Sequence, residues 1–218
     1  MTIIDLNVLQ RLFPDITPSQ REALTHYARM LRDWNQRINL VSRRDIEHLW
    51  AHHLLPSLVP LTLSPPPEGA WLLDIGSGGG LPAIPVAIMR PDLEVLMVDS
   101  IRKKALFLET AVAELGLGTV AVVNERVEEL GREREYRGRF HVVSARAVAS
   151  VSTLLDWGAP FLKSGGYWWL WKGSSDVPDL ERATEPGGWR CAVDEPPAEL
   201  ARDDERMAAQ RWFRVYKP

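Results

Sequence analysis

The fold is decided by the stretch Trp71-Leu72-Leu73-Asp74-Ile75-Gly76-Ser77-Gly78-Gly79-Gly80, in which a largely apolar segment runs directly into a glycine-rich turn. Residues 71–75 are apolar apart from Asp74 and show no alternation, which predicts a short strand buried on both faces. Four glycines within residues 76–80 cost backbone entropy that an ordinary turn would not require, and without a Cβ they let the backbone approach a ligand closely. We therefore predict a ligand-binding loop after this strand, with a purely structural turn as the alternative.

Apolar segments of the same kind recur after this loop, and helical patterns separate them. We expect strands at residues 94–98, 120–123, 140–144 and 167–171. We expect the intervening helices at residues 81–89, 100–115 and 151–161, with Ser100 as the cap of the second. Such alternation predicts an α/β fold in which a mainly parallel sheet is covered by helices on both faces. Two more segments, residues 190–193 and 212–216, are expected to close the sheet as an antiparallel pair.

The chain before the loop has a helical pattern instead. Thr17-Pro18 is a typical helix start, and the apolar residues that follow at helical spacing predict a buried stripe of Leu24, Tyr27, Ala28, Leu31 and Trp34. A second helix is expected over about residues 45–55, ending ahead of Pro56. The linker Ser64-Pro65-Pro66-Pro67-Glu68-Gly69 marks a boundary. We therefore predict an N-terminal helical extension, residues 1–64, packed on an α/β domain of residues 65–218.

The composition excludes several kinds of protein. The single cysteine, Cys191, allows no disulfide, and no His, Cys, Asp and Glu residues are spaced as metal ligands, so no metal is predicted. We see no signal peptide or membrane-spanning run, and we expect a cytoplasmic protein with no membrane partner. The net charge of −3 is not typical of nucleic-acid binding. Residues 29–44, however, hold five arginines against one acid, which indicates a local basic patch or an ordinary solvated face.

The glycine pattern discriminates between ligands. A phosphate-binding loop would end in Gly-Lys-Ser/Thr, which is missing here, and the dinucleotide pattern fails at Leu81, where it requires glycine or alanine. The full pattern Asp-x-Gly-x-Gly-x-Gly is present from Asp74 to Gly80. This pattern is expected around S-adenosylmethionine, whose sulfonium and amino groups favour an acid near the loop.

Asp99 supports the same cofactor. It ends the second predicted strand, 23 residues after Gly76, close to the spacing at which an acid binds the ribose of a nucleotide. One carboxylate can accept hydrogen bonds from both ribose hydroxyls. A cap on the following helix is the alternative role for this side chain.

These residues and several further blocks resemble the RsmG/GidB family, the bacterial small-subunit rRNA guanine-N7 methyltransferases. The loop Asp74–Pro85 carries the family signature apart from Ala83, where the family usually has glycine. The other matching blocks, in the family's order, are Trp34–Leu40, Val98–Lys104, Arg126–Leu130, Val143–Ala147 and Lys172-Gly173. The resemblance implies a class I, Rossmann-like, S-adenosylmethionine-dependent methyltransferase that methylates N7 of a guanosine in 16S ribosomal RNA. The acidic segment 176–205 lies outside the resemblance and receives no role.

The resemblance also implies which residues bind the cofactor. It sets Gly76 and Leu81 against the cofactor, and the pair Val127-Glu128 beside the adenosine. It implies that Arg146 contacts the cofactor or lies at the mouth of the site, with a purely structural role as the alternative. Together with the residues predicted from the loop itself, the cofactor-binding set is Asp74, Gly76, Gly78, Leu81, Asp99, Val127, Glu128 and Arg146.

The implied chemistry needs few catalytic groups. Guanine N7 carries a free lone pair and no proton, so its methylation by in-line displacement requires proximity and alignment. The sequence has no Asn-Pro-Pro-Tyr-type block after the fourth strand, which methylation of an exocyclic amine would use, and no Pro-Cys nucleophile. We therefore assign no catalytic residue and keep only Arg146 as an option. A small-molecule or protein methyltransferase and a non-catalytic RNA-binding assembly factor are the alternative functions.

The expected partner is 16S ribosomal RNA or a precursor of the small ribosomal subunit, bound by a monomer. Basic side chains are expected to contact RNA phosphates, although a solvated helix start would explain Lys103 and Lys104 equally well. The predicted RNA-binding residues are Arg37, Arg43, Arg44, Lys103, Lys104, Lys163 and Lys172.

Overall fold

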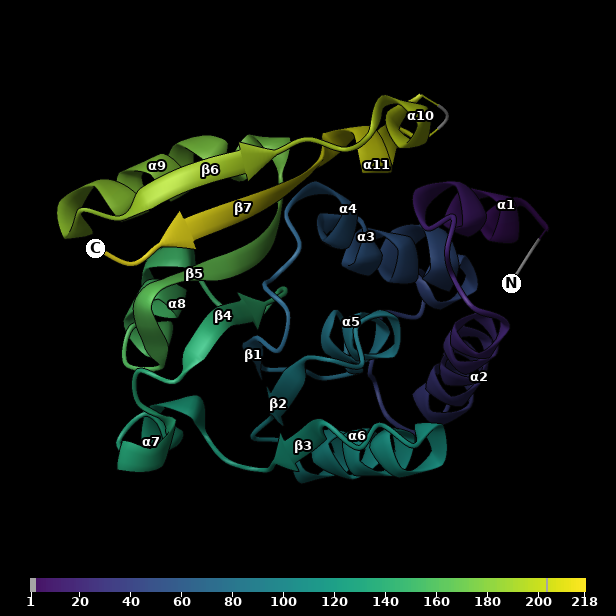
Figure 1. Cartoon of the computed structure of the whole chain (residues 1–218), viewed down its shortest axis with the longest axis horizontal. Coiled ribbons are helices and arrows are strands. Elements are labelled where there is room, and N and C mark those ends of the chain that lie inside the picture. Colours follow the sequence, from purple (N-terminus) through teal and green to yellow (C-terminus); the bar gives the residue numbers. More distant parts are fainter. Residues whose placement is uncertain (1–2, 203) are drawn as a thin grey trace.

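The computed structural model describes residues 3–202 and 204–218 of the chain. At its centre is one seven-stranded sheet in the order β3-β2-β1-β4-β5-β7-β6 (Figure 1). The strands are β1 Trp71–Ile75, β2 Glu94–Val98, β3 Val120–Val123, β4 Phe140–Ala145, β5 Leu162–Gly173, β6 Arg190–Asp194 and β7 Gln210–Tyr216. β1 to β5 are parallel, and β7 lies antiparallel between β5 and β6. The mainly parallel sheet and the closing antiparallel pair confirm the predicted fold.

Helices cover both faces of the sheet. They are α1 Ile3–Leu12, α2 Pro18–Asn35, α3 Leu55–Leu58, α4 Pro60–Leu63, α5 Ala83–Met89, α6 Arg102–Leu115, α7 Val127–Leu130, α8 Val151–Gly158, α9 Val177–Thr184, α10 Ala198–Ala201 and α11 Glu205–Ala209. Successive strand residues point to opposite faces, so the neighbours Leu72 and Leu73 lie in two separate apolar clusters. α2, α5 and α6 cover the first cluster, and α8 and α9 cover the second (Figure 1). No helix in the described part of the chain is long and apolar enough to span a membrane.

Helix α2 begins and packs as its sequence predicts. Thr17 Oγ1 accepts a hydrogen bond from the backbone N–H of Gln20 at 3.2 Å, and Gln20 Oε1 accepts one from Thr17 N–H at 3.0 Å. This reciprocal pair is a capping box. The half-buried Trp34 packs its ring edge against Phe107 of α6, with 5.5 Å between ring centroids. The N-terminal helices thus share an apolar cluster with the sheet, and the boundary between residues 64 and 65 remains a prediction.

The segment after α2 differs from its prediction. Instead of one helix over residues 45–55, the chain forms two short helical turns, Ile46–His48 and Trp50–Leu54, followed by α3 and α4. The expectation that helical structure stops ahead of Pro56 was wrong. Pro56 and Pro60 lie in the first turns of α3 and α4, where a helix needs no backbone N–H.

Two other predictions need correction. Ser100 does not cap α6, because the helix begins at Arg102 with Ile101 at its N-cap position and has no side-chain cap. β5 extends beyond the expected residues 167–171 at both ends. It does so because it pairs with β4 as early as Leu162 and with β7 as far as Gly173.

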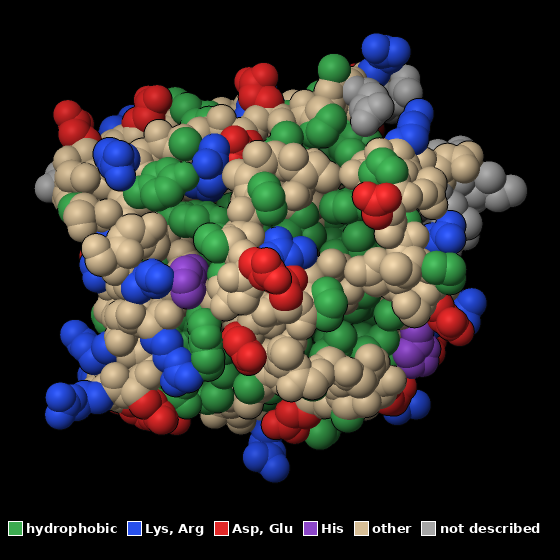
Figure 2. Space-filling model, in the orientation of Figure 1, with side chains coloured by type: hydrophobic (Ala, Val, Ile, Leu, Met, Phe, Trp, Pro, Cys, Tyr) green, Lys and Arg blue, Asp and Glu red, His purple; other side chains and the backbone are tan. Residues whose placement is uncertain are grey.

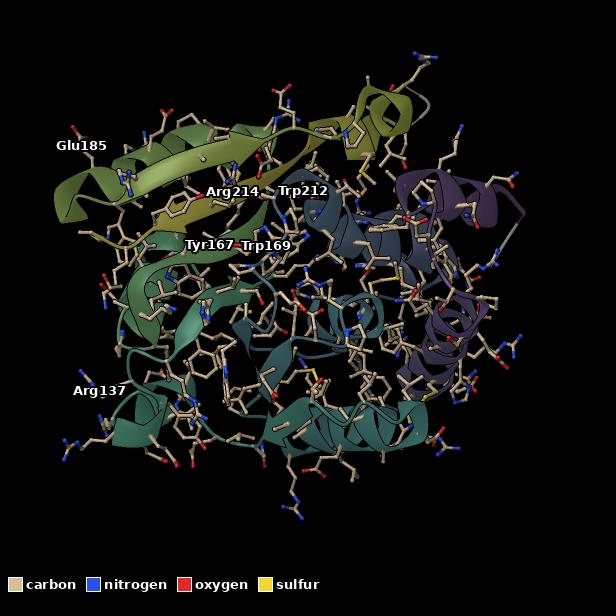
Figure 3. The ribbon with its side chains drawn as sticks, viewed as in Figure 1. Arg137, Tyr167, Trp169, Glu185, Trp212 and Arg214 are labelled. Carbon is tan, nitrogen blue, oxygen red and sulfur yellow. The ribbon has the colours of Figure 1, made fainter. Side chains whose placement is uncertain are left out.

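One carbonyl group joins the N-terminal helices to the C-terminal strands. Trp171 in β5 and Trp212 in β7 both donate their indole N–H to the carbonyl oxygen of Pro56, at 2.8 and 3.0 Å. Trp169 and Trp212, labelled in Figure 3, are fully buried in the core. These contacts hold α3 against the part of the sheet where β5 and β7 lie side by side.

The carboxyl ends of β1 to β5 meet at one edge of the sheet, because these strands are parallel. This edge collects the glycine loop after β1, Asp99 after β2, residues 124–128 after β3 and Arg146 after β4. Open α/β sheets bind their ligands at this edge.

Candidate functional site

A cleft of about 800 Å³ opens at the carboxyl ends of the parallel strands, and this volume is usual for a small-molecule site. The strand order gives the cleft two sides, with β1 between them. The β2–β3 side is the part lined by residues 75–79, 81, 98–101, 104 and 125–128. The β4–β5 side is the part lined by residues 40–42, 45, 53, 146–148, 157, 171–173, 176, 206 and 210.

The predicted cofactor-binding residues meet at this cleft with one exception. Those that line it are Gly76, Gly78, Leu81, Asp99, Val127, Glu128 and Arg146. Asp74 is only 1% exposed and lies behind the loop, where its Oδ1 accepts a hydrogen bond from Ser144 Oγ at 2.6 Å. Its Oδ2 is buried without a hydrogen-bond partner among the described residues, and burial raises the pKa of this carboxyl to about 7. The structure therefore gives Asp74 a supporting position between β1 and β4, off the cleft wall.

The conformation of the loop accounts for most of its glycines. Gly76, Gly78 and Gly80 have φ values of 66°, 55° and 82°, in the left-handed region that favours glycine. A Cβ on Gly76 would lie 2.7 Å from Val148 Cγ2, and one on Gly80 would lie 2.4 Å from Ile84 Cδ1. At Gly78 nothing comes closer than 3.7 Å to that position, and this glycine faces the cleft.

Helix α2 supports the loop from behind. The hydroxyl of the fully buried Tyr27 donates a hydrogen bond to the carbonyl oxygen of Gly79 at 2.5 Å. Asn35, at the end of α2, accepts hydrogen bonds from the backbone N–H groups of Leu40 and Val41, at 2.8 and 2.9 Å, and both of these residues line the cleft. The sequence pattern predicts only a buried stripe here. The available signal was the phenol of Tyr27, because a buried tyrosine hydroxyl needs a partner.

Asp99 joins the loop to the start of α6. Its Oδ2 accepts a hydrogen bond from Gly78 N–H and its Oδ1 accepts one from Ile101 N–H, both at 2.8 Å. The bond to Ile101 fixes the turn that precedes α6 but does not cap this helix, which has Ile101 at its N-cap position and no side-chain cap. The side chain of Asp99 also lies on the cleft wall. A carboxylate has about four acceptor positions, so two remain for donors such as ribose hydroxyls, and that contact stays a prediction.

Val127 and Glu128 begin α7, directly after β3. Val127 is buried, and Glu128 accepts a hydrogen bond from Arg126 Nη2 on its Oε1 at 3.1 Å. The pKa of Glu128 is lowered, chiefly by its own backbone N–H and further by Arg126. Glu128 therefore presents an anion to the β2–β3 side at neutral pH.

Arg146 follows β4 and holds the N-terminal segment in place. Its Nη2 donates a hydrogen bond to the carbonyl oxygen of His52 at 2.8 Å, and its Nη1 donates to that of His53 at 3.4 Å. Burial lowers the pKa of this guanidinium to about 10, so it remains charged at neutral pH. The structural role is thus visible in these bonds, while a contact with the cofactor stays a prediction.

Comparison with known proteins identifies the family. Residues 20–188 match the model of the GidB family, described as rRNA small subunit methyltransferase G. The chain belongs to this family. A relative named ribosomal RNA small subunit methyltransferase G, from Neisseria gonorrhoeae (strain ATCC 700825 / FA 1090), is 44% identical over 161 residues, 73% of this chain and 74% of the relative. One of the same name from Desulfitobacterium hafniense (strain Y51) is 41% identical over 165 residues, 76% of this chain and 68% of the relative.

Solved methyltransferase structures share the fold of this GidB family member. A SAM-dependent O-methyltransferase from Thermotoga maritima matches with a TM-score of 0.54 and 17% identity, covering 84% of this chain and 68% of that one. A SAM-dependent methyltransferase from Aquifex aeolicus matches with a TM-score of 0.50 and 15% identity, covering 68% and 82%. These matches confirm the Rossmann-like fold. The protein is a methyltransferase, and its cofactor is S-adenosylmethionine.

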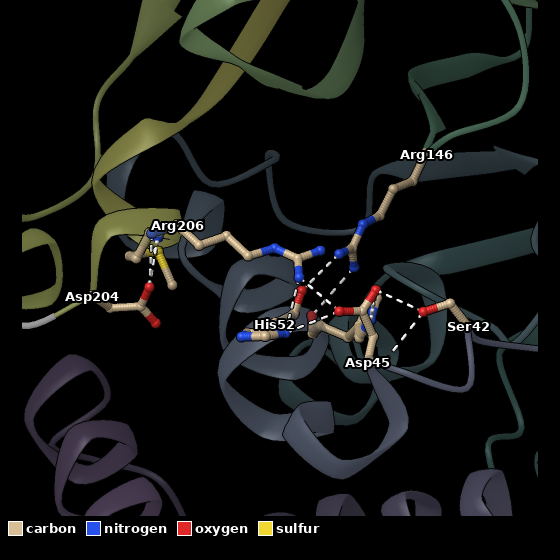
Figure 4. A network of polar contacts seen from close by, with 8 residues as sticks. Ser42, Asp45, His52, Arg146, Asp204 and Arg206 are labelled. Carbon is tan, nitrogen blue, oxygen red and sulfur yellow. Dashed lines mark hydrogen bonds and ion pairs between the residues drawn. The ribbon is translucent and has the colours of Figure 1, made fainter.

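The β4–β5 side of the cleft in this GidB protein holds a network of polar contacts (Figure 4). Asp45 Oδ1 accepts a hydrogen bond from Arg206 Nη1 at 2.7 Å, and Asp45 Oδ2 accepts one from Ser42 Oγ at 2.9 Å. His52 Nδ1 lies 3.1 Å from Asp45 Oδ1 and 2.9 Å from Arg206 Nη1. The hydrogen bond from Arg206 is the main reason that the pKa of Asp45 lies well below its usual range. Neither residue was predicted, and Arg206 lies beyond residue 188, where the GidB match ends.

His53 faces the same side. Its Nε2 is buried without a hydrogen-bond partner among the described residues and lies 3.8 Å from Asp45 Oδ2. Burial lowers the pKa of His53 to about 3, so the imidazole is neutral at physiological pH. Within the described residues no group of three or more His, Cys, Asp or Glu could hold a metal ion.

The predicted RNA-binding residues are spread over the molecule. Those on the surface are Arg37, Arg43, Arg44 and Lys103, and those on the cleft wall are Lys104 and Lys172. Lys163 lies at the amino end of β5, where its Nζ is 2.8 Å from His141 Nε2, on the edge of the sheet opposite to the cleft. On the face shown in Figure 2, Lys and Arg side chains lie among acidic ones rather than in one patch.

Proposed function

We propose that this protein methylates N7 of a guanosine in 16S ribosomal RNA, with S-adenosylmethionine as the methyl donor. The observation that carries the proposal is the match of residues 20–188 to a family described as rRNA small subunit methyltransferase G. The matched residues include the glycine loop and most of the cleft wall. The substrate is then 16S RNA itself or a precursor of the small ribosomal subunit.

The proposed position of the cofactor is the β2–β3 side of the cleft. The volume of about 800 Å³ is sufficient, and Asp99 retains acceptor positions for ribose hydroxyls. When bound, the cofactor supplies a methyl group on a sulfonium, which a lone pair can attack from the opposite side. The residues that would hold it are Gly76, Gly78, Leu81, Asp99, Val127 and Glu128.

The target guanine would enter from the β4–β5 side. Its N7 has a lone pair and no proton, so the chain has to align the base and does not have to remove a proton. The neutral His53, with a pKa lowered to about 3 by burial, is a poor proton acceptor at neutral pH. This environment supports a transfer by alignment, because general-base catalysis requires a group that titrates near the working pH.

RNA phosphates would be bound around the mouth of the cleft. Residues 40–42 lie on the cleft wall and bring the flanking arginines close to the mouth. Lys163 is left out because it lies on the opposite edge of the sheet. Phosphate contacts position an RNA but do not select its base. The proposed phosphate-binding residues are Arg37, Arg43, Arg44, Lys103, Lys104 and Lys172. The monomeric state and the cytoplasmic location stay predictions.

The test uses purified protein, labelled S-adenosylmethionine and 16S RNA that lacks its natural methylations, supplied both as a transcript and within small ribosomal subunits. We expect label in 7-methylguanosine, identified by chromatography and mass spectrometry of the digested nucleosides. Cofactor binding without any label in RNA would contradict the substrate. Label in a different nucleoside would contradict the methylated position alone.

A further inference from the structure

The β4–β5 side of the cleft carries more positive than negative side chains. Arg146, Lys172 and Arg206 line it, against the carboxylates of Asp45 and Asp176. Both carboxylates already have partners within the protein. Asp45 binds Arg206 and Ser42, and Asp176 Oδ2 accepts a hydrogen bond from Gly173 N–H at 2.7 Å. This side of the cleft is therefore suited to an anion.

Arg206 is the cation best able to meet such an anion. Its side chain is 53% exposed, whereas that of Arg146 is half-buried and already donates to the carbonyl groups of His52 and His53. A guanidinium has five N–H donors, and among the described residues only Nη1 of Arg206 has hydrogen-bond partners. Within this part of the chain, its Nε and Nη2 groups have no hydrogen-bond partner and can donate to a ligand.

The backbone holds Arg206 firmly at this position. Asp204 caps α11, and its Oδ1 accepts hydrogen bonds from the backbone N–H groups of Arg206 and Met207, at 2.9 and 3.0 Å. Met207 is buried in the core. In Figure 4 the side chain of Arg206 reaches from this helix toward His52 and Asp45 on the opposite wall. Asp45 thus orients the guanidinium before any ligand arrives.

We propose that Arg206 binds a backbone phosphate of the RNA strand that carries the target guanosine. This inference rests on the proposed function. A base that is to be methylated has to leave its stack and enter the cleft, and its phosphates follow to the mouth. A guanidinium binds phosphate through two parallel N–H groups, and Lys172 adds a second positive charge on the same side. Arg206 lies beyond residue 188, where the family match ends.

The experiment compares Arg206→Gln with Arg182→Gln, a matched control that removes the same charge from the exposed face of α9. Binding of an unmodified 16S RNA transcript is measured over a series of KCl concentrations, and S-adenosylmethionine binding is measured by calorimetry. We expect Arg206→Gln to weaken RNA binding about 10-fold, as loss of a charge-assisted contact does. We expect the slope of log K against log salt to fall by about 0.7 to 0.9, the value for one phosphate contact. Cofactor affinity should change less than about two-fold, which is well below the effect of one lost hydrogen bond.

Two further variants separate phosphate binding from a purely structural link between Arg206 and Asp45. Asp45→Asn removes the competing negative charge but keeps a side-chain oxygen that can accept the hydrogen bond from Arg206 Nη1 and orient it. RNA binding should therefore be as tight as in the wild type or tighter. Arg206→Lys should restore the salt slope but only part of the affinity, because an ammonium cannot bind phosphate through two parallel groups. The proposal is overturned if Asp45→Asn weakens RNA binding as much as Arg206→Gln, or if Arg206→Gln leaves the slope unchanged. If the wild type itself neither binds nor methylates the RNA, the proposed function fails as well.

Discussion

The β2–β3 side of the cleft is built mainly from backbone, whereas the β4–β5 side is built from side chains that come from distant parts of the chain. On the first side, the N–H of Gly78 and the N–H of Ile101 both donate to the carboxylate of Asp99. On the second, Arg206 meets Asp45 across 161 positions of sequence, and Arg146 meets the carbonyl group of His52 across 94.

We expect this difference to separate the two binding steps, that of the cofactor and that of the RNA. The backbone of a short loop can hardly change without losing its shape, so substitutions there should act on cofactor affinity. Side chains gathered from several segments can be exchanged singly, so substitutions on the β4–β5 side should act on stability and on RNA binding. Each prediction below tests whether this division holds.

Gly78→Asp should have the largest effect and should act on the cofactor. Gly78 has a φ of 55° and faces the cleft, so a side chain there is strained and also enters the space proposed for the cofactor. We expect the affinity for S-adenosylmethionine to fall about 100-fold, or about 2.7 kcal/mol, measured by calorimetry. The control is Gly138→Asp, where φ is 64° and nothing lies within 4 Å of the added Cβ. Equal affinities for S-adenosylmethionine in the two variants would contradict the proposal that the glycine loop binds the cofactor.

Asp74→Asn tests the buried carboxyl group that lies behind the glycine loop, off the cleft wall. The folded pKa of about 7 exceeds the ordinary value of 3.8, so the folded protein holds this proton more tightly than the unfolded chain does. The stabilisation is complete below about pH 4 and is lost as the pH rises to about 7. Relative to Asp74→Asn, the wild type should lose a few kcal/mol of unfolding free energy over this interval, at about 1.4 kcal/mol per pH unit at most. Urea unfolding at several pH values measures the difference, and a constant difference would contradict the raised pKa.

Arg146→Gln probes the β4–β5 side. The substitution removes the hydrogen bonds to the carbonyl groups of His52 and His53, and bonds from a charged donor contribute about 1.5 to 3 kcal/mol. We expect the free energy of unfolding to fall by about 2 kcal/mol, with a smaller loss of cofactor affinity than in Gly78→Asp. Urea unfolding and calorimetry give the two numbers. A loss of cofactor affinity as large as in Gly78→Asp would indicate that Arg146 binds the cofactor.

Tyr27→Phe should have the smallest effect. It removes the hydrogen bond to the carbonyl oxygen of Gly79 but keeps the buried ring, so the loop loses one support of about 1 kcal/mol. We expect the KM for S-adenosylmethionine to rise roughly 3- to 10-fold with little change in kcat. Tyr167→Phe, at a half-buried tyrosine of β5, controls for the loss of a phenol elsewhere. If Tyr27→Phe lowers stability but leaves the cofactor affinity unchanged, the hydroxyl has only a packing role.

The sequence predicted those features that depend on neighbouring residues. The apolar run into glycines predicted β1 and its loop, and the spacing to Asp99 predicted a carboxylate at the end of β2. The N-cap at Thr17 and the closing strand pair were likewise visible in short patterns. Each of these depends on the chemistry of a few consecutive residues, and the structure confirms the elements.

Contacts between residues that are distant in the sequence could not be predicted from it. Nothing near Arg206 indicates that Asp45 is its partner, and nothing near Tyr27 indicates Gly79. The position of Lys163 could not be predicted for a related reason: this lysine at the start of β5 lies on the edge of the sheet opposite to the cleft, and its contact with RNA stays a prediction. The helix expected over residues 45–55 was wrong because Pro56 was taken as a stop rather than as a first-turn residue.

Pro60 has a consequence for how the two ends of the chain stay together. In a regular helix the N–H of residue 60 would bond to the carbonyl oxygen of Pro56, but proline has no N–H to give. The carbonyl oxygen of Pro56 therefore has no donor within the helical segment. It accepts hydrogen bonds from the indole N–H groups of Trp171 in β5 and Trp212 in β7 instead. The absence of an N–H at Pro60 thus leaves an acceptor through which β7, the strand that follows Arg206, is bound to α3.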